Sequence, residues 1–81
     1  MKISYSPHFK RSFENFSSGV HRKFQKQIIY FLRNIRHPSL RVKKYDEERG
    51  IWQARADKNI RFYFLIKGDT YILLDIKKHP R

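Results

Sequence analysis

The feature that most constrains the fold is an alternation of apolar and polar residues through the second half of the chain. Residues 51–56, 60–66 and 71–76 are rich in the β-branched and aromatic residues that favour strands, and residues 40–45 form a weaker, basic strand. Short turn segments, Asp57-Lys58-Asn59 and Lys67-Gly68-Asp69-Thr70, separate the last three strands. The pattern therefore predicts an antiparallel β-meander.

The alternation also assigns each strand residue to one of two sheet faces. The even positions form an apolar face: Trp52, Ala54, Ala56, Ile60, Phe62, Phe64, Ile66, Ile72, Leu74 and Ile76. The odd positions form a polar face: Gln53, Arg55, Asp57, Arg61, Tyr63, Leu65, Tyr71, Leu73, Asp75, Lys77 and, by continuation, His79. We expect the apolar face to pack on the helices.

The register of the strands follows from these two faces. A slip by one residue would turn Asp75 and Lys77 into the core, so we exclude two-residue turns. We expect a three-residue loop within residues 67–70, with Gly68 or Asp69 left-handed, and a turn of the same parity at residues 57–59. Arg55 then lies opposite or nearly opposite Arg61. This like-charge pair destabilises a sheet unless an anion such as phosphate lies between the guanidinium groups.

The first half of the chain predicts a short strand and two helices. Residues 2–5 are the strand candidate, and Ser6-Pro7 is a helix start with Ser6 as N-cap. A second helix starts at the break Ser17-Ser18-Gly19 and ends at His37-Pro38. The apolar stripes are Phe9, Phe13 and Phe16 in the first helix, and Val20, Phe24, Ile28, Phe31 and Ile35 in the second. We expect one α+β domain over residues 1–81: an N-terminal strand, an αα-hairpin and a twisted antiparallel β-meander packed on the helices.

The composition limits the possible chemistry. There are 19 Lys and Arg residues against 7 Asp and Glu, a net charge of +12, which predicts an anionic partner. The absence of cysteine excludes disulfides and thiolate chemistry. No apolar run approaches the roughly 20 residues of a membrane span, and the N-terminus lacks a signal-peptide core. We expect a cytoplasmic protein without a membrane partner, and no metal or cofactor, because the acids form no convincing cluster.

The basic residues of the polar face suggest RNA chemistry. Attack of a 2′-hydroxyl on its own phosphate needs proton transfer and cations around the phosphorus, which histidine and arginine can supply. The candidates are Arg55, Arg61, Tyr63, Lys77 and His79, bordered by Arg41, Lys43 and Lys44. Two plainer interpretations stay open. Arg55 and Arg61 can be solvated or paired with Asp57 and Asp75, and His79 can be an ordinary surface residue near a chain end.

The order of these elements, with "GIWQARADKNIRFYFLIKGDTYILLDIKKH" in the second half, resembles the RelE/ParE superfamily of type II toxin–antitoxin toxins, with its microbial-RNase-like fold. The resemblance covers essentially the whole chain. The positions that carry it are Trp52, Arg55, Arg61, Gly68-Asp69 and His79.

The resemblance implies a toxin that cleaves mRNA in the ribosomal decoding site without a metal, an mRNA interferase that inhibits translation and is held by an antitoxin. In the branch similar to YoeB and YafQ, Arg61 matches an arginine that stabilises the scissile phosphate. Arg55 matches a second arginine of that site, and His79 a histidine that transfers protons. The expected RNA contacts are Arg41, Lys43, Lys44, Lys77, Lys78 and Arg81.

The resemblance also leaves alternatives. Val42 stands where that branch carries a glutamate base; Tyr45, Tyr63, Asp46 or a lysine could substitute for it, and the sequence assigns no base. A ParE-like, non-enzymatic inhibitor of DNA gyrase has the same fold, and a non-catalytic nucleic-acid-binding module is a third possibility. The antitoxin should carry an acidic segment complementary to the charge of +12.

Overall fold

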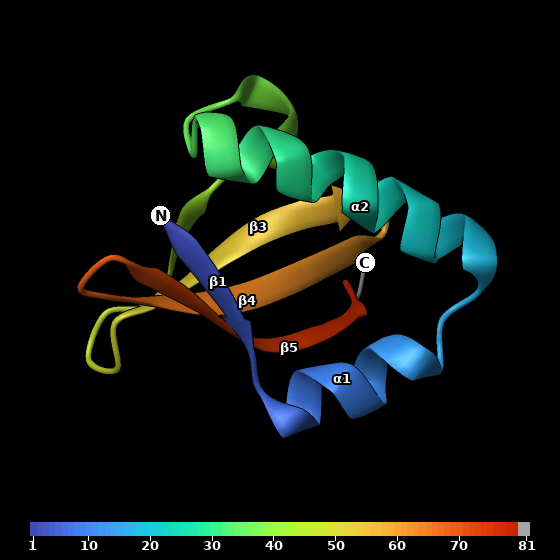
Figure 1. The fold of residues 1–81 in the computed structure, drawn as a ribbon, viewed down its shortest axis with the longest axis horizontal. Helices are drawn as coiled ribbons and strands as arrows, with labels where there is room; N and C mark the ends of the chain where they lie inside the picture. The colour runs from blue at the N-terminus through green and yellow to red at the C-terminus, as the bar shows by residue number, and fades with distance from the viewer. Residues whose placement is uncertain (80–81) are drawn as a thin grey trace.

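The computed structural model describes residues 1–79, which form one mixed sheet and two helices (Figure 1). The elements are β1 (Lys2–Tyr5), α1 (Pro7–Glu14), α2 (Ser18–Arg33), a 3₁₀ turn η1 (Pro38–Leu40), β2 (Lys43–Asp46), β3 (Ile51–Asp57), β4 (Ile60–Lys67) and β5 (Thr70–Lys78). The strand order is β1-β5-β4-β3-β2, with β1 parallel to β5 and every other pair antiparallel. The predicted α+β architecture is confirmed. No helix in the described residues is long and apolar enough to cross a membrane.

Both helices begin at a serine N-cap, of which the one at Ser6 was predicted. The Ser6 hydroxyl accepts a hydrogen bond from the Phe9 amide at 3.0 Å, and the Ser17 hydroxyl accepts one from the Val20 amide at 3.3 Å. The end of α2 was predicted too late. The helix stops at Arg33 because Asn34 takes an extended conformation, so Ile35 lies beyond the helix.

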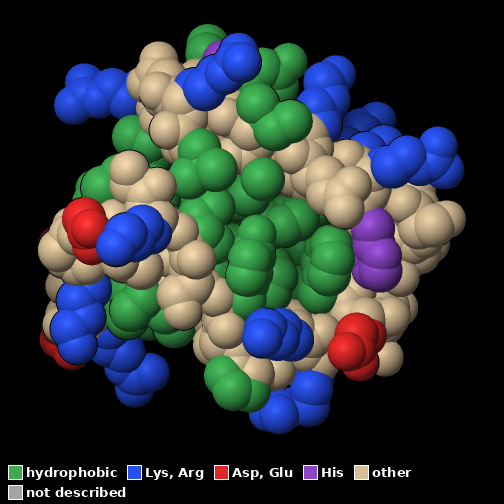
Figure 2. Space-filling model, viewed as in Figure 1, with side chains coloured by type: hydrophobic (Ala, Val, Ile, Leu, Met, Phe, Trp, Pro, Cys, Tyr) green, Lys and Arg blue, Asp and Glu red, His purple; other side chains and the backbone are tan. Residues whose placement is uncertain are grey.

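An aromatic core joins both helices to one sheet face. Phe62 of β4 meets Phe24 and Phe31 of α2 edge-on, each with ring centroids 5.4 Å apart, and Phe9 of α1 lies 5.5 Å from Phe24. These contacts suit the quadrupoles of the rings. On the view of Figure 2, apolar side chains gather between α1 and α2. We refer to this side as the helix face and to the opposite side of the sheet as the outer face.

The strand predicted at residues 40–45 is shorter and starts later. Leu40 belongs to η1 and is fully buried, while β2 begins only at Lys43. The turn is stabilised locally because the Ser39 amide donates to Nδ1 of His37 and Pro38 fixes the first position. Arg41 then adopts a left-handed conformation with φ of 47°, which redirects the chain into β2.

The prediction for the β4–β5 turn was wrong in length. Lys67 pairs with Thr70, so the loop has two residues, with Gly68 at φ of 61° as its left-handed residue. After a two-residue loop, the odd positions of β5 lie opposite even positions of β4. A β-bulge restores the predicted pairing further along β5, where Leu74 is the extra residue between the pairs Tyr63–Asp75 and Phe64–Leu73.

The bulge changes the faces of the first half of β5. Tyr71 and Leu73, predicted on the polar face, are buried in the core, whereas Ile72 and Leu74, predicted as core, are only partly buried. Asp75 and Lys77 keep the predicted face because the parity is restored after the bulge. Ile66 was also predicted as core but is 45% exposed, one residue before the end of β4.

The prediction for the β3–β4 turn was also wrong in length. Asp57 pairs with Ile60 across the two residues Lys58 and Asn59, and a register shift between Arg55 and Asp57 restores the parity. The predicted juxtaposition of Arg55 and Arg61 is confirmed, since the two residues are direct cross-strand partners.

Candidate functional site

A cavity of about 290 Å³ opens on the outer face, where β2, β3 and β4 meet the end of β5. It is lined by Arg41, Lys43, Gln53, Arg55, Arg61 and His79. Five of these residues were predicted as site residues from the sequence. We call this cavity the arginine cavity.

Arg61 is anchored to the neighbouring turn. Its Nη1 donates hydrogen bonds to the backbone carbonyl oxygens of Asp57 at 3.0 Å, Lys58 at 3.2 Å and Ile60 at 3.2 Å. These contacts fix the position of the guanidinium group but neutralise none of its charge, because carbonyl groups are uncharged acceptors.

Arg55 stands in an unusually cationic position. Its Nε is buried and has no hydrogen-bond partner among the described residues. Burial, together with the charges of Arg41 and Arg61, lowers the pKa of Arg55. An unsatisfied buried donor between like charges lowers the stability of the fold. A bound anion would satisfy the donor and offset the repulsion.

The structure contradicts the interpretation that acids of the sheet neutralise these arginines. The Asp57 carboxylate pairs with Lys23 at 3.2 Å, and the Asp75 carboxylate lies 3.3 Å from Nε2 of His8. In residues 1–79, neither Arg55 nor Arg61 forms an ion pair. Nor does this part of the chain contain a group of three His, Asp or Glu side chains able to hold a metal ion.

His79 is held beside the arginines through its backbone. Its amide donates to the Asn59 carbonyl oxygen at 2.7 Å, which fastens the end of β5 to the β3–β4 turn. The side chain is exposed and forms part of the cavity wall. An imidazole in this place can donate a proton to a group bound in the cavity or accept one from it. Arg81, predicted to contact RNA, lies outside the described residues.

Three predicted RNA contacts lie away from the cavity. The Lys44 ammonium lies 4.3 Å from the centre of the Trp52 ring, and the Lys77 ammonium lies 5.1 Å from the centre of the Tyr63 ring. Lys78 pairs with Ile60 in the sheet, and its side chain is exposed. None of the three lines the arginine cavity.

The candidate general bases are reduced in number. Val42 lines a different cavity beside Trp52 and is not among the residues that line the arginine cavity. Tyr63 is 6% exposed, and burial, with smaller effects of Tyr45 and Asp75, raises its pKa despite the opposing charge of Arg61. Asp46 pairs with Arg49 at 3.7 Å.

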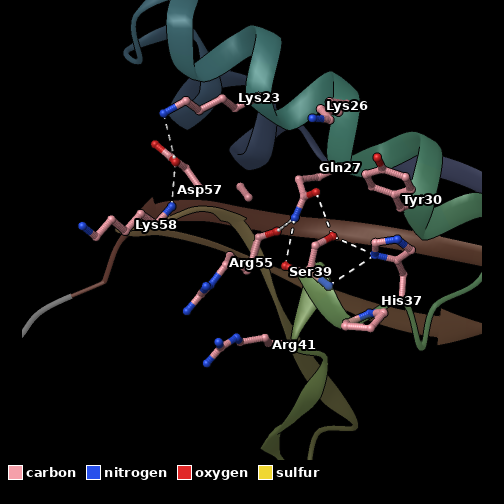
Figure 3. Close-up of a pocket in the computed structure, with 12 residues that line it drawn as sticks. Lys23, Lys26, Gln27, Tyr30, His37, Ser39, Arg41, Arg55, Asp57 and Lys58 are labelled. Carbon is pink, nitrogen blue, oxygen red and sulfur yellow. Dashed lines mark hydrogen bonds and ion pairs between the residues drawn. The ribbon is translucent and has the colours of Figure 1, made fainter.

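Sequence reasoning missed a network that fixes the two sides of the site. Nε2 of Gln27 donates to the backbone oxygens of Ser39 at 3.1 Å and Arg55 at 2.9 Å, and the Ser39 hydroxyl donates to Oε1 of Gln27 at 3.2 Å (Figure 3). Gln27 thereby joins α2 to the loop before Arg41 and to β3. A sequence signal existed, because Gln27 lies between Phe24 and Phe31 on the apolar stripe of the helix.

Comparisons with solved structures agree with this architecture. The chain is similar to a YoeB/ParE toxin from Agrobacterium tumefaciens, with 15% identity and a TM-score of 0.80 over 99% of this chain and 100% of that one. It is similar to RelE in an archaeal RelE–RelB complex from Pyrococcus horikoshii, with 13% identity and a TM-score of 0.77 over 99% and 96% of the two chains. YoeB from Staphylococcus aureus, whose structure is a dimer, gives 15% identity and 0.76 over 99% and 98%.

These similarities show a fold of the RelE/ParE toxin type along the whole chain, as the sequence resemblance implied. No protein-family model matches the sequence, and no curated protein matches it significantly.

Proposed function

We propose that the protein is the toxin of a type II toxin–antitoxin system and acts as a ribosome-dependent mRNA endoribonuclease in the cytoplasm. The observation that carries the proposal is the arginine cavity, in which three arginines and His79 lie around a space with an unsatisfied cationic donor. The fold similarity to YoeB and RelE toxins supports the same class.

The proposed reaction is an internal transfer of a phosphodiester. The 2′-oxygen of one nucleotide forms a bond to the adjacent phosphorus, and the bond from phosphorus to the 5′-oxygen of the next nucleotide breaks. A base takes the 2′-hydroxyl proton, and His79 gives a proton to the departing 5′-oxygen. The products are a 2′,3′-cyclic phosphate and a 5′-hydroxyl. Arg55 and Arg61 bind the phosphate oxygens as negative charge develops, the type of stabilisation that contributes most in such sites.

We assign the base to Lys43. No carboxylate lines the arginine cavity in the part of the chain that the structure describes, and Lys43 is the lysine in its wall. A lysine amine in its neutral form can accept the proton of a 2′-hydroxyl group bound beside it. Arg41 then contributes a third positive group to the bound phosphate.

The proposed protein partner is an antitoxin with an acidic segment. One of the similar structures is an archaeal RelE–RelB complex, and another is a DinJ–YafQ complex. The net charge of +12 favours rapid capture by an acidic chain. Such a segment bound over the arginine cavity would block the access of RNA to it.

The test is to map cleavage ends on a defined mRNA translated in a purified system. The wild type should cut at codon positions only when ribosomes are present, and His79→Ala should reduce cleavage about 10²-fold or more, the range of general acid catalysis. His8→Ala is the matched control, because His8 is exposed and lies outside the cavity. Intact mRNA with a folded wild type would contradict the proposal and favour the gyrase inhibitor.

A further inference from the structure

A second, larger cavity adjoins the arginine cavity on the side of α2. Its volume is about 530 Å³, and it shares Arg41 and Arg55 with the arginine cavity. The remaining walls come from α2, from the 3₁₀ turn and from the end of β3 (Figure 3). We call it the helix-side cavity. Because two side chains belong to both walls, the two cavities adjoin along a shared cationic border.

The lining of the helix-side cavity is strongly cationic. It contains five basic side chains, Lys23, Lys26, Arg41, Arg55 and Lys58, against one carboxylate, that of Asp57. The carboxylate is already used, because it accepts hydrogen bonds from the Lys23 ammonium at 3.2 Å and from the Lys58 amide. Lys26 and the Lys58 ammonium make no ion pair within residues 1–79. The excess positive charge predicts an anionic ligand.

The shared border has a donor without an acceptor. The buried Nε of Arg55 has no partner among the described residues, although the backbone oxygen of Arg55 is held by Gln27. In Figure 3 the Arg41 and Arg55 side chains extend side by side and away from α2. A ligand with phosphates on both sides of this border would give each guanidinium an anionic neighbour, whichever cavity it faces.

We propose that the helix-side cavity binds a phosphate of the same RNA strand whose scissile phosphate lies in the arginine cavity. The proposal rests on the proposed function for the identity of the ligand. Lys26 and Lys58 are the residues that distinguish this second phosphate site, since both line the helix-side cavity and neither lines the other. Contacts to phosphate carry no base information, so this site should extend the footprint without adding sequence preference.

The experiment measures binding of RNA that cannot be cleaved, with 2′-O-methyl groups throughout. The variant is Lys26→Gln/Lys58→Gln, and the matched control is Lys10→Gln/Lys67→Gln, which removes the same charge from exposed lysines outside both cavities. The dissociation constant of a hexanucleotide and of a dinucleotide with one phosphate is determined at several salt concentrations. Thermal melting verifies that each variant is folded.

We expect the double variant to bind the hexanucleotide several-fold more weakly than the control does, with an unchanged affinity for the dinucleotide. For single strands the slope of log K against log salt is negative, and it becomes less negative by about 0.7 for each phosphate contact that is lost. A slope equal to that of the control would overturn the site. Equal losses for both RNAs would indicate general attraction, and a loss seen only with an added ribosomal RNA fragment would assign the cavity to a second RNA.

This measurement is independent of catalysis because the RNA stays intact. If the slope changes but no mRNA is cleaved by the wild type, the phosphate site stands and the ribonuclease proposal fails. If mRNA is cleaved but the slope is unchanged, only the phosphate site fails.

Discussion

The two faces of the sheet have opposite effects on the stability of the fold. On the helix face, aromatic rings from α1, α2 and β4 contact one another and are removed from water. On the outer face, Arg55 and Arg61 are cross-strand partners, and Nε of Arg55 is buried without a partner in the described chain. The first arrangement stabilises the fold, and the second opposes it. The difference supports the proposal that the outer face binds a ligand.

The largest effect on stability should come from the helix face. Phe62→Ala removes a fully buried ring that contacts Phe24 and Phe31, so the free energy of unfolding should fall by about 3–5 kcal/mol. Leu65→Ala, on the outer side of the same strand, should cost less than about 1.5 kcal/mol, because that side chain is only partly buried. Urea unfolding followed by circular dichroism measures both. Equal costs would contradict the division between the faces.

The largest effect on activity should come from the outer face. Arg61→Lys keeps the charge but loses the planar fork, so cleavage of translated mRNA should fall by about 10²-fold. The variant also loses the bonds from Nη1 to the turn carbonyls, which should cost about 1 kcal/mol of stability. Arg49→Lys, whose Nε lies 3.7 Å from Asp46, is the control. Unchanged cleavage in Arg61→Lys would show that charge alone suffices there.

Gln27 connects the two faces and should therefore affect both quantities. Gln27→Ala removes its bonds to the backbone oxygens of Ser39 and Arg55 and should lower the free energy of unfolding by about 1–2 kcal/mol. The cavity residues should then be less well placed, which lowers kcat more than it raises KM. Gln25→Ala, exposed on the same helix, is the control. A purely structural role would leave kcat of the folded fraction unchanged.

The sequence predicted the parts of the fold that depend on regular periodicity. The helix stripes, the Ser6 cap and the pairing of Arg55 with Arg61 all follow from the sequence pattern. The faces of β5 did not follow, because alternation assumes an uninterrupted strand. The two-residue turn at Gly68 places odd positions of β5 opposite even positions of β4, whereas the residues after Leu74 pair odd with odd. The bulge at Leu74 allows both, and no sequence feature marks it.

The residues of the candidate site could be predicted from the sequence better than the shape of its cavities. Arg55, Arg61 and His79 share one strand parity, so their proximity could be inferred from alternation. The helix-side cavity could not, because it depends on the left-handed turn at Arg41 and on tertiary bonds from Gln27. Lys77 was assigned to the RNA from its parity, yet its ammonium lies over the Tyr63 ring.

Removing the repulsion between Arg55 and Arg61 should stabilise the protein in the absence of a bound anion. Arg55→Gln eliminates one member of the like-charge pair and should raise the free energy of unfolding in chloride by about 0.5–1 kcal/mol, while it reduces mRNA cleavage. Phosphate at constant ionic strength should raise the Tm of the wild type, since it binds the folded state, and raise it less in the variant. Thermal melting in both salts measures this. A lower Tm for Arg55→Gln in chloride would show that the arginine stabilises the fold without a ligand.

The smallest effect concerns the ion pair between Lys23 of α2 and Asp57 at the end of β3, both of which line the helix-side cavity. Burial by itself would raise the pKa of Asp57, but the Lys58 amide and the Lys23 ammonium outweigh it and lower this pKa. A lowered pKa in the folded state stabilises the protein above the carboxyl's unfolded pKa, and the contribution disappears as the pH falls through the folded value. Lys23→Gln should therefore cost about 0.2–1 kcal/mol near neutral pH, as for exposed pairs, and nothing once Asp57 is protonated. Urea unfolding from about pH 2 to about pH 7, with Lys10→Gln as the control, measures the difference. A cost that persists in acid would assign Lys23 a packing role instead of a charge.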